Sequence, residues 1–196
     1  MADSTRNTLP LAVTVSGIGG QGIQLLSKTL ALAATKAGRH AMLAADYGGE
    51  MRGGPSSTSF VIDDKPVNAL PILEETDAIV LSHHKFSERA CERLLPGGLC
   101  MVNSSIVDQS VIPAGARVIE VPAADLAKQI GSPQTSGLIL AAAFNALYGL
   151  VDHEILVDAM RELIPPYRQQ AVPKNIEAMG VGRDAVAGHD LTGVPA

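Results

Sequence analysis

The sequence predicts an α/β fold, a Rossmann-like three-layer domain with a mostly parallel sheet, a hairpin insertion and a C-terminal helical extension. Two observations lead to this prediction. Short apolar runs alternate with helical stretches along the chain, which is typical of a parallel sheet covered by helices. The 196 residues are also poor in aromatics, at 3% with no Trp, so the core must be built from small aliphatic side chains.

The first predicted strand, Leu11–Val15, leads into the glycine-rich turn GIGGQG at residues 17–22 and then into a helix from Ile23 to about Ala37. Glycine permits a tight turn and lets a ligand approach the main chain. The N–H groups at the start of a helix favour an anion. The turn is therefore a candidate phosphate site. The alternative is a tight turn that only lets the helix pack on the sheet, because a lone GxGxxG pattern is weak evidence.

The second predicted strand, Ala41–Ala45, is followed by another glycine-rich stretch, DYGGEMRGGPS at residues 46–56. Arg52 in this loop could hold a carboxylate or phosphate bidentately, or could simply pair with Glu50 on the surface. Asp46 ends the strand where dinucleotide folds carry a ribose-binding acid. The candidate ligand-binding residues are Gly17, Gly19, Gly20, Gln21, Gly22, Asp46, Tyr47, Glu50, Arg52, Gly53 and Gly54.

The middle of the chain continues the alternation of strands and helices. Residues 57–62 and 65–67 are predicted to form a hairpin around the turn Asp63-Asp64. Further strands are expected at residues 78–82, 99–102 and 118–121, and helices at 86–95 and 123–130.

The C-terminal part reads as helical. Thr135–Leu150 is apolar on nearly all sides, so it is either central in the fold or an inter-subunit face. An amphipathic helix is expected at 153–163 and a short one at 174–179. Residues 1–180 are predicted to form a single domain, and residues 181–196 a flexible or partner-held tail.

Several kinds of function are disfavoured by the composition. A formal charge of −5 without Lys/Arg runs disfavours nucleic acid as a partner. Cys91 and Cys100 lie outside any CxxC pattern, and adjacent His83 and His84 point different ways, so we expect no metal or cluster site. No apolar run reaches the length of a membrane span, and a cytoplasmic location is expected. No nucleophile stands beside a base, so we assign no catalytic residue.

The two glycine stretches, GIGGQG at 17–22 and YGGEMRGG at 47–54, resemble the gamma subunit or gamma domain of thiamine-diphosphate-dependent 2-oxoacid:ferredoxin oxidoreductases. The similarity continues through the strand at 56–60, Pro66-Val67 and Asp77, and Asn175, Ala178 and Gly180 resemble the family's closing helix. One departure lies at residues 131–137. Gln134 and Gly137 stand where the family usually has an arginine and an asparagine.

The resemblance implies a structural subunit, close to coenzyme A, of an enzyme that oxidatively decarboxylates a 2-oxoacid to an acyl-CoA and passes the electrons to ferredoxin or a similar acceptor. Thiamine diphosphate, Mg²⁺ and iron–sulfur clusters would belong mainly to the other subunits, of alpha, beta and delta (ferredoxin) type. Pyruvate, 2-oxoglutarate, branched-chain, indolepyruvate and phenylglyoxylate enzymes are all open. The alternatives are an independent NAD(P)-binding oxidoreductase and a non-catalytic scaffold.

Overall fold

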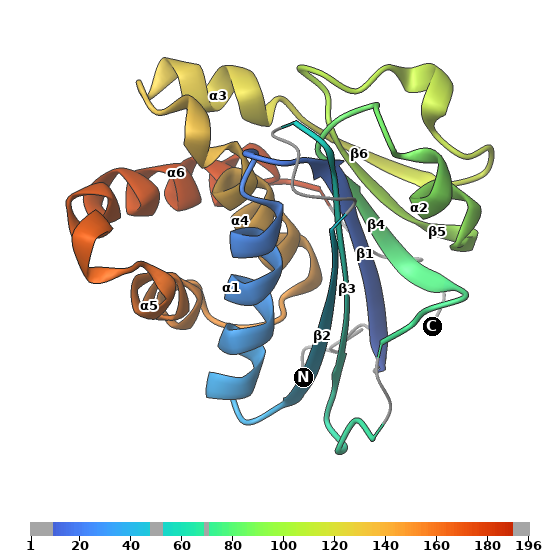
Figure 1. Ribbon diagram of the computed structural model, residues 1–196, viewed down its shortest axis with the longest axis horizontal. Helices are drawn as coiled ribbons and strands as arrows, with labels where there is room; N and C mark the ends of the chain where they lie inside the picture. Colours follow the sequence, from blue (N-terminus) through green and yellow to red (C-terminus); the bar gives the residue numbers. More distant parts are fainter. Residues whose placement is uncertain (1–9, 48–52, 69–70, 190–196) are drawn as a thin grey trace.

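The computed structural model describes residues 10–47, 53–68 and 71–189, and its centre is a six-stranded sheet in the order β2-β3-β1-β4-β5-β6 (Figure 1). The pairs β1–β4, β4–β5 and β5–β6 are parallel, and β3 is antiparallel to both β1 and β2. The strands are β1 (Leu11–Ile18), β2 (His40–Tyr47), β3 (Pro55–Asp63), β4 (Thr76–Leu81), β5 (Leu94–Asn103) and β6 (Arg117–Val121). The predicted α/β class with a mostly parallel sheet is confirmed.

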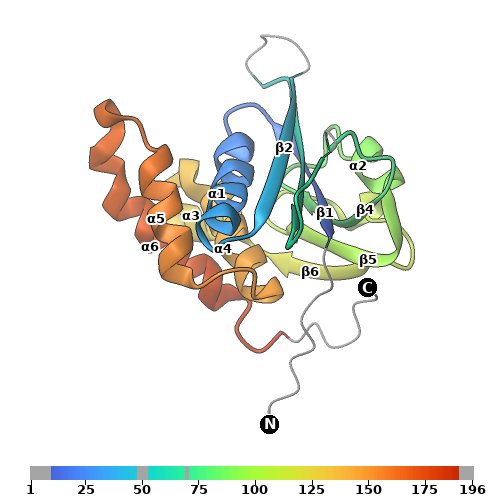
Figure 2. The same ribbon diagram turned by 90° about the horizontal axis from the view of Figure 1, so that it is seen from below.

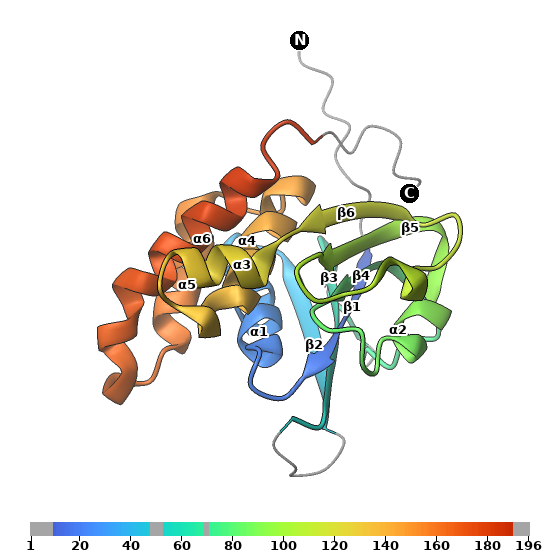
Figure 3. The same ribbon diagram turned by 90° about the horizontal axis from the view of Figure 1, so that it is seen from above.

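The helices are distributed unequally over the two sides of the sheet (Figures 2 and 3). One side carries α1, α3, α4, α5 and α6, whereas the short α2 lies on the other. The helices are α1 (Ile23–Lys36), α2 (Glu88–Glu92), α3 (Ala123–Gln129), α4 (Ser136–Tyr148), α5 (His153–Leu163) and α6 (Val172–Ala185), with 3₁₀ turns η1 (Gln109–Val111), η2 (Pro133–Thr135) and η3 (Pro166–Ala171). None of these helices, within the described residues, is long and apolar enough to cross a membrane.

The predicted hairpin is present, but its second arm was assigned wrongly. β3 pairs along its length with β2, from His40 opposite Asp63 to Tyr47 opposite Ser56. Residues 65–67, which the structure describes, are not in a strand. Pairing with β2 and β1 places β3 inside the sheet, where Phe60 and Ile62 are completely buried. Residues 65 and 66 are exposed and Val67 is partly buried, so this segment could not take the same place.

Helix α4 is the centre of the helix layer rather than an inter-subunit face. Every residue from Ser136 to Asn145 is buried, and α1, α3, α5 and α6 all contact this helix. Its carboxyl end is held by Asn145, whose amide bonds both the N–H and the C=O of Val151. The apolar character on all sides therefore reflects burial within the subunit.

Two helices differ in length from the prediction because tertiary packing overrides local preference. α2 ends at Glu92 since Leu94 and Leu95 join β5 instead. α6 continues to Ala185, beyond the predicted end at Met179. A Cβ at Gly182 would collide with the backbone carbonyl of Ile139, so glycine lets α6 lie close against α4. This close packing holds the helix through two glycines that disfavour it locally.

Candidate functional site

The glycine-rich turn joins the carboxyl end of β1 to the start of α1, as predicted. Gly20 (φ 100°) and Gly22 (φ 77°) both adopt the left-handed region that favours glycine. Gly22 is the N-cap of α1 and accepts the N–H of Leu26 at 2.9 Å. Since glycine offers no side-chain cap, the N–H groups of the first helical turn depend on the surroundings for partners.

The glycines of the turn serve two different needs. A Cβ at Gly17 would lie 2.8 Å from Cδ1 of Ile23 and 3.0 Å from Cβ of Ser82, so this position is filled by packing. At Gly20 no described atom lies within 4 Å of the Cβ position. Close packing thus explains Gly17, whereas Gly20 needs glycine for its φ and leaves open space beside the main chain.

Gln21 holds the turn in place. Its Oε1 accepts hydrogen bonds from the backbone N–H of Ile18 and from the hydroxyl of Ser82, both at 3.2 Å. The first bond closes the turn on itself and the second ties it to the carboxyl end of β4. The amide oxygen of Gln21 is therefore directed into the protein, where it sets the shape of the turn.

The two glycine stretches meet in space. The N–H of Gly19 donates to the carbonyl of Gly54 at 2.9 Å, and Gly53 has a φ of 80°. Asp46 and Tyr47 end β2, where their backbones pair with Ser57 and Ser56. Glu50 and Arg52 lie outside the described residues.

A cavity of about 540 Å³ opens beside the turn and is lined by segments far apart in the sequence. Arg168, from η3, was missed by the sequence analysis because nothing in its local spacing marks it. Asn175 was noted by resemblance alone; it is buried, and its Nδ2 lies 3.6 Å from Sδ of Met160. The lining includes Gly19, Gly20, Gly22, Gln24, Gly54, Ser56, Gln134, Leu138, Arg168 and Asn175.

Gln24 is the least satisfied polar group of this cavity. Both Nε2 and Oε1 are buried and have no hydrogen-bond partner among the described residues. A buried amide without partners costs about 1–3 kcal/mol, so an incoming polar group would be stabilised here. The sequence offered a weak signal, a glutamine in the first turn of a helix that follows a glycine turn.

Gly137 and Gln134, which differ from the residues usual in the resembled family, lie against the glycine-rich turn. A Cβ at Gly137 would lie 2.7 Å from the carbonyl oxygen of Gln21. Glycine therefore lets the first turn of α4 lie against the glycine-rich turn. Gln134 still lines the cavity, so this loop contributes to the site without the arginine.

The surroundings of the two cysteines and of the adjacent histidines are those of structural residues. Burial raises the pKa of the Cys100 thiol to about 12, and Cys91 donates to the carbonyl of Val111 at 3.2 Å. The rings of His83 and His84 are 4.3 Å apart, and burial lowers the pKa of His83. Across the described ranges no three His, Cys, Asp or Glu side chains gather as a metal site would require.

Comparison with known proteins gives consistent matches. The family model described as pyruvate ferredoxin/flavodoxin oxidoreductase matches residues 12–185. The chain is 30% identical over 159 residues to the pyruvate/ketoisovalerate oxidoreductases common subunit gamma of Thermococcus kodakarensis, covering 78% of this chain and 85% of that protein. It is 29% identical over 174 residues to the ketoisovalerate oxidoreductase subunit VorA of Methanothermobacter marburgensis. That match covers 88% of this chain and 36% of the relative, so the chain spans about a third of VorA.

Solved structures share the fold. The gamma subunit of a keto/oxoacid ferredoxin oxidoreductase from Geobacter sulfurreducens has a TM-score of 0.75 at 24% identity, covering 91% of this chain and 97% of that chain. The 2-oxoglutarate:ferredoxin oxidoreductase of Magnetococcus marinus, solved with 2-oxoglutarate, coenzyme A and succinyl-CoA, has a TM-score of 0.80 at 18% identity. That match covers 94% of this chain and 33% of the other.

Proposed function

The chain belongs to the pyruvate ferredoxin/flavodoxin oxidoreductase family, and from this premise we propose that it works as the gamma subunit of a complex that oxidatively decarboxylates a 2-oxoacid to an acyl-CoA. Its membership confirms the resemblance inferred from the two glycine stretches. We also propose, rather than derive, the 2-oxoacid substrate, the electron acceptor and a cytoplasmic location. The chain is similar to VorA over most of the chain's own length, but it spans only about a third of VorA.

A role near coenzyme A is supported mainly by one observation. The hydrogen bond from Gly19 to Gly54 brings the two glycine stretches together. Their main chains border a cavity of about 540 Å³, which Gly20 also lines. Each interaction of a phosphate with the N–H groups at the start of α1 would contribute about 0.3–1 kcal/mol to binding. The unpartnered amide of Gln24 is a further polar group there, and Arg168 also lines the cavity.

These residues fit a phosphate-bearing ligand, and they would bind and orient it rather than react with it. Gly20 and Gly22 would let phosphates approach the main chain, and Gln21 would keep the turn in shape. Arg52 would add a charge-assisted hydrogen bond worth about 1.5–3 kcal/mol. Coenzyme A supplies the acyl-accepting thiol when it is bound. Thiamine diphosphate, Mg²⁺ and the iron–sulfur clusters would be held by alpha, beta and delta-type subunits.

An independent NAD(P)-binding enzyme is less well supported by the strand order. In dinucleotide folds the strand that carries the ribose-binding acid lies next to the strand of the glycine turn. Here β3 separates β2 from β1, which moves Asp46 one strand further away, or about 5 Å. A titration of the isolated chain with NADH tests this alternative directly, and saturable binding would favour it.

The proposal is tested in the intact complex with wild-type or variant chain. Arg52→Ala and Gln24→Leu are each expected to raise the KM for coenzyme A about tenfold, the equivalent of about 1.4 kcal/mol. Turnover at saturating coenzyme A should stay near wild type because these groups would not touch the reacting atoms. Lys128→Ala is the control, because Lys128 forms an exposed ion pair with Asp125 and does not line the cavity.

Two results would contradict the proposal. If both variants assemble with an unchanged KM, the cavity does not serve coenzyme A, and Arg52 returns to a surface pair with Glu50. If the purified chain alone oxidises any 2-oxoacid, it carries a catalytic centre that the described residues do not contain.

A further inference from the structure

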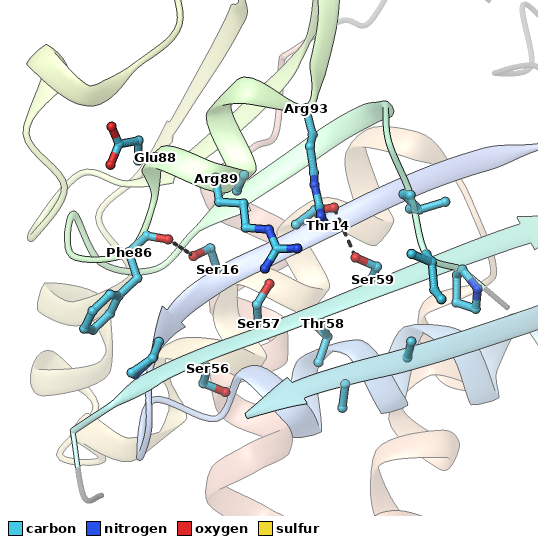
Figure 4. Close-up of a pocket in the computed structure, with 17 residues that line it drawn as sticks. Thr14, Ser16, Ser56, Ser57, Thr58, Ser59, Phe86, Glu88, Arg89 and Arg93 are labelled. Atoms are coloured by element: carbon cyan, nitrogen blue, oxygen red, sulfur yellow. Dashed lines mark hydrogen bonds between the residues drawn. The ribbon is translucent and has the colours of Figure 1, made fainter. Parts of the chain in front are cut away.

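The side of the sheet that faces away from α1 carries hydroxyl groups where β1 and β3 pair. Thr14 lies opposite Ser59, and Ser16 lies opposite Ser57. These four side chains form the floor of a second cavity, of about 620 Å³ (Figure 4). We call the side of the sheet that faces away from α1 the open side. Its walls come from residues 71–73, Phe86 and α2.

The floor satisfies its own hydrogen bonds. Ser16 donates to the carbonyl of Phe86 at 2.8 Å, and Ser57 donates to the carbonyl of Val15 at 3.2 Å. The hydroxyls of Thr14 and Ser59 lie 3.3 Å apart and bond each other. Because most of the hydroxyl protons are already used, the floor is a preformed surface that gives a small anion few donors.

The rim of the cavity is apolar and exposed. Ile72 is 79% exposed and Phe86 is 49% exposed, both unusually high for large apolar side chains. Phe86 also has a φ of 64°, in the left-handed region that non-glycine residues rarely adopt. Backbone strain of this kind persists where neighbours enforce it, and the bond from Ser16 to the Phe86 carbonyl is one such restraint. The ring is therefore held at the rim at a cost in folding.

The wall formed by α2 and Arg93, the residue that follows it, carries two arginines. Arg89 and Arg93 extend over the floor, whereas Glu88 points away from it (Figure 4). The charged residues that line the cavity are Glu88, Arg89 and Arg93, so two of the three are positive in a chain whose formal net charge is −5. Arginine and aromatic residues beside an aliphatic rim are the composition typical of protein–protein hot spots.

Resting on the role as a gamma subunit, we propose that the open side receives a segment of a partner subunit of the same oxidoreductase. The segment carries a carboxylate side chain, which pairs with Arg93 over the hydroxyl floor. Apolar residues beside that carboxylate pack against Ile72 and Phe86. The arginines of the wall select an acidic segment. Because the floor already uses most of its hydroxyl protons, it loses few hydrogen bonds when the segment covers it.

The test uses the tagged full-length chain, expressed together with the other subunits of its enzyme. Arg93→Glu reverses the charge of the wall, and Ile72→Glu removes the apolar rim at an exposed position where the cost in folding is small. Each is expected to weaken recovery of the partner subunits about tenfold or more. Arg161→Glu, on α5 with a side chain 49% exposed, is the matched charge reversal on the other side of the sheet and should assemble as wild type. Melting temperatures of the isolated variants confirm that each is folded.

The outcomes separate this proposal from the proposed function. If the wild-type chain brings down no partner subunits, the role as a gamma subunit fails, and docking on the open side fails with it. If the wild type, Arg93→Glu and Ile72→Glu all assemble equally, only docking on the open side is overturned. If pyrophosphate or citrate raises the melting temperature of the isolated chain, Arg93→Gln abolishes that rise and assembly is unchanged, the cavity is a small-anion site instead.

Discussion

The residues of β1 and β3 that face the helices are mainly apolar, apart from Thr58, which bonds the hydroxyl of Ser27 on α1. Most of those facing the open side near the carboxyl end of β1 carry hydroxyl groups. Val13, Val15 and Phe60 are fully buried in the main core beneath α1 and α4. Thr14 and Ser59, one position along on the same strands, line the second cavity. Alternation along a strand thus gives two chemically different surfaces from one pair of strands.

The comparison indicates a division of tasks between the two sides. The helix side holds the larger apolar core, and a smaller one lies beside α2 on the other side. The glycine-rich turn lies at the edge of the helix side, between β1 and α1. The open side has one short helix, and part of its surface is satisfied by hydrogen bonds rather than by apolar packing. Substitutions in the helix-side core should therefore act on stability, and those at the rim and the arginine wall of the second cavity should act mainly on assembly.

The largest effect is expected for Phe60→Ala on the helix side. Phe60 is 0% exposed, and truncating a buried phenylalanine costs about 3–5 kcal/mol. Its neighbour Ser59 is the matched control on the open side, where Ser59→Ala removes one hydrogen bond worth about 0.5–1.5 kcal/mol. Urea unfolding of the isolated chain measures both, and equal losses would remove the distinction between the two sides.

A smaller effect is expected at the edge between the two sides. Gly20→Val should cost about 1–3 kcal/mol because valine is strained at a φ of 100°. No described atom stands within 4 Å of the new Cβ, so strain rather than collision is the cause. Unfolding measures the strain, and the KM for coenzyme A in the complex measures any blocking of the turn. A variant that changes neither quantity would make the turn an ordinary loop.

The smallest effect is a pH dependence on the helix side. Burial, reinforced by Arg183, lowers the pKa of His153 below its usual value of 6.5, so the folded chain binds fewer protons there than the unfolded chain. The contribution of neutral His153 to the free energy of unfolding is fully present above pH 6.5. It is lost as the pH falls through the pKa that His153 has in the folded chain. His153→Gln should therefore reduce the fall in unfolding free energy between pH 7 and 5. An unchanged pH profile would mean that His153 stays exposed enough to protonate freely.

Local features of the sequence predicted much of the fold. The amphipathic period of residues 153–163 matches α5, and the helix after the glycine turn, with Ile23, Leu26 and Leu30 inward, matches α1. These elements depend on neighbours three or four residues away, which the sequence contains directly. The tight turn at the glycines was also predictable, because few backbone conformations lead from a strand directly into a helix.

The remaining features depend on contacts between distant segments. Which strand pairs with β3 is decided by which neighbours bury Phe60 and Ile62, and the alternation of residues 55–63 is the same for either partner. Arg168 and Gln24 lie in one cavity although 144 positions separate them, and no local pattern relates them.

The sequence by itself determined the alternation of strands and helices, the glycine-rich turn and the family, because each depends on residue type and short-range spacing. The tertiary structure decided that β3 lies between β2 and β1, that helices cover one side of the sheet far more than the other, and that Arg89 and Arg93 overlie a hydroxyl floor. Those outcomes arise from long-range burial and pairing, whose free energy is shared among segments far apart in the chain.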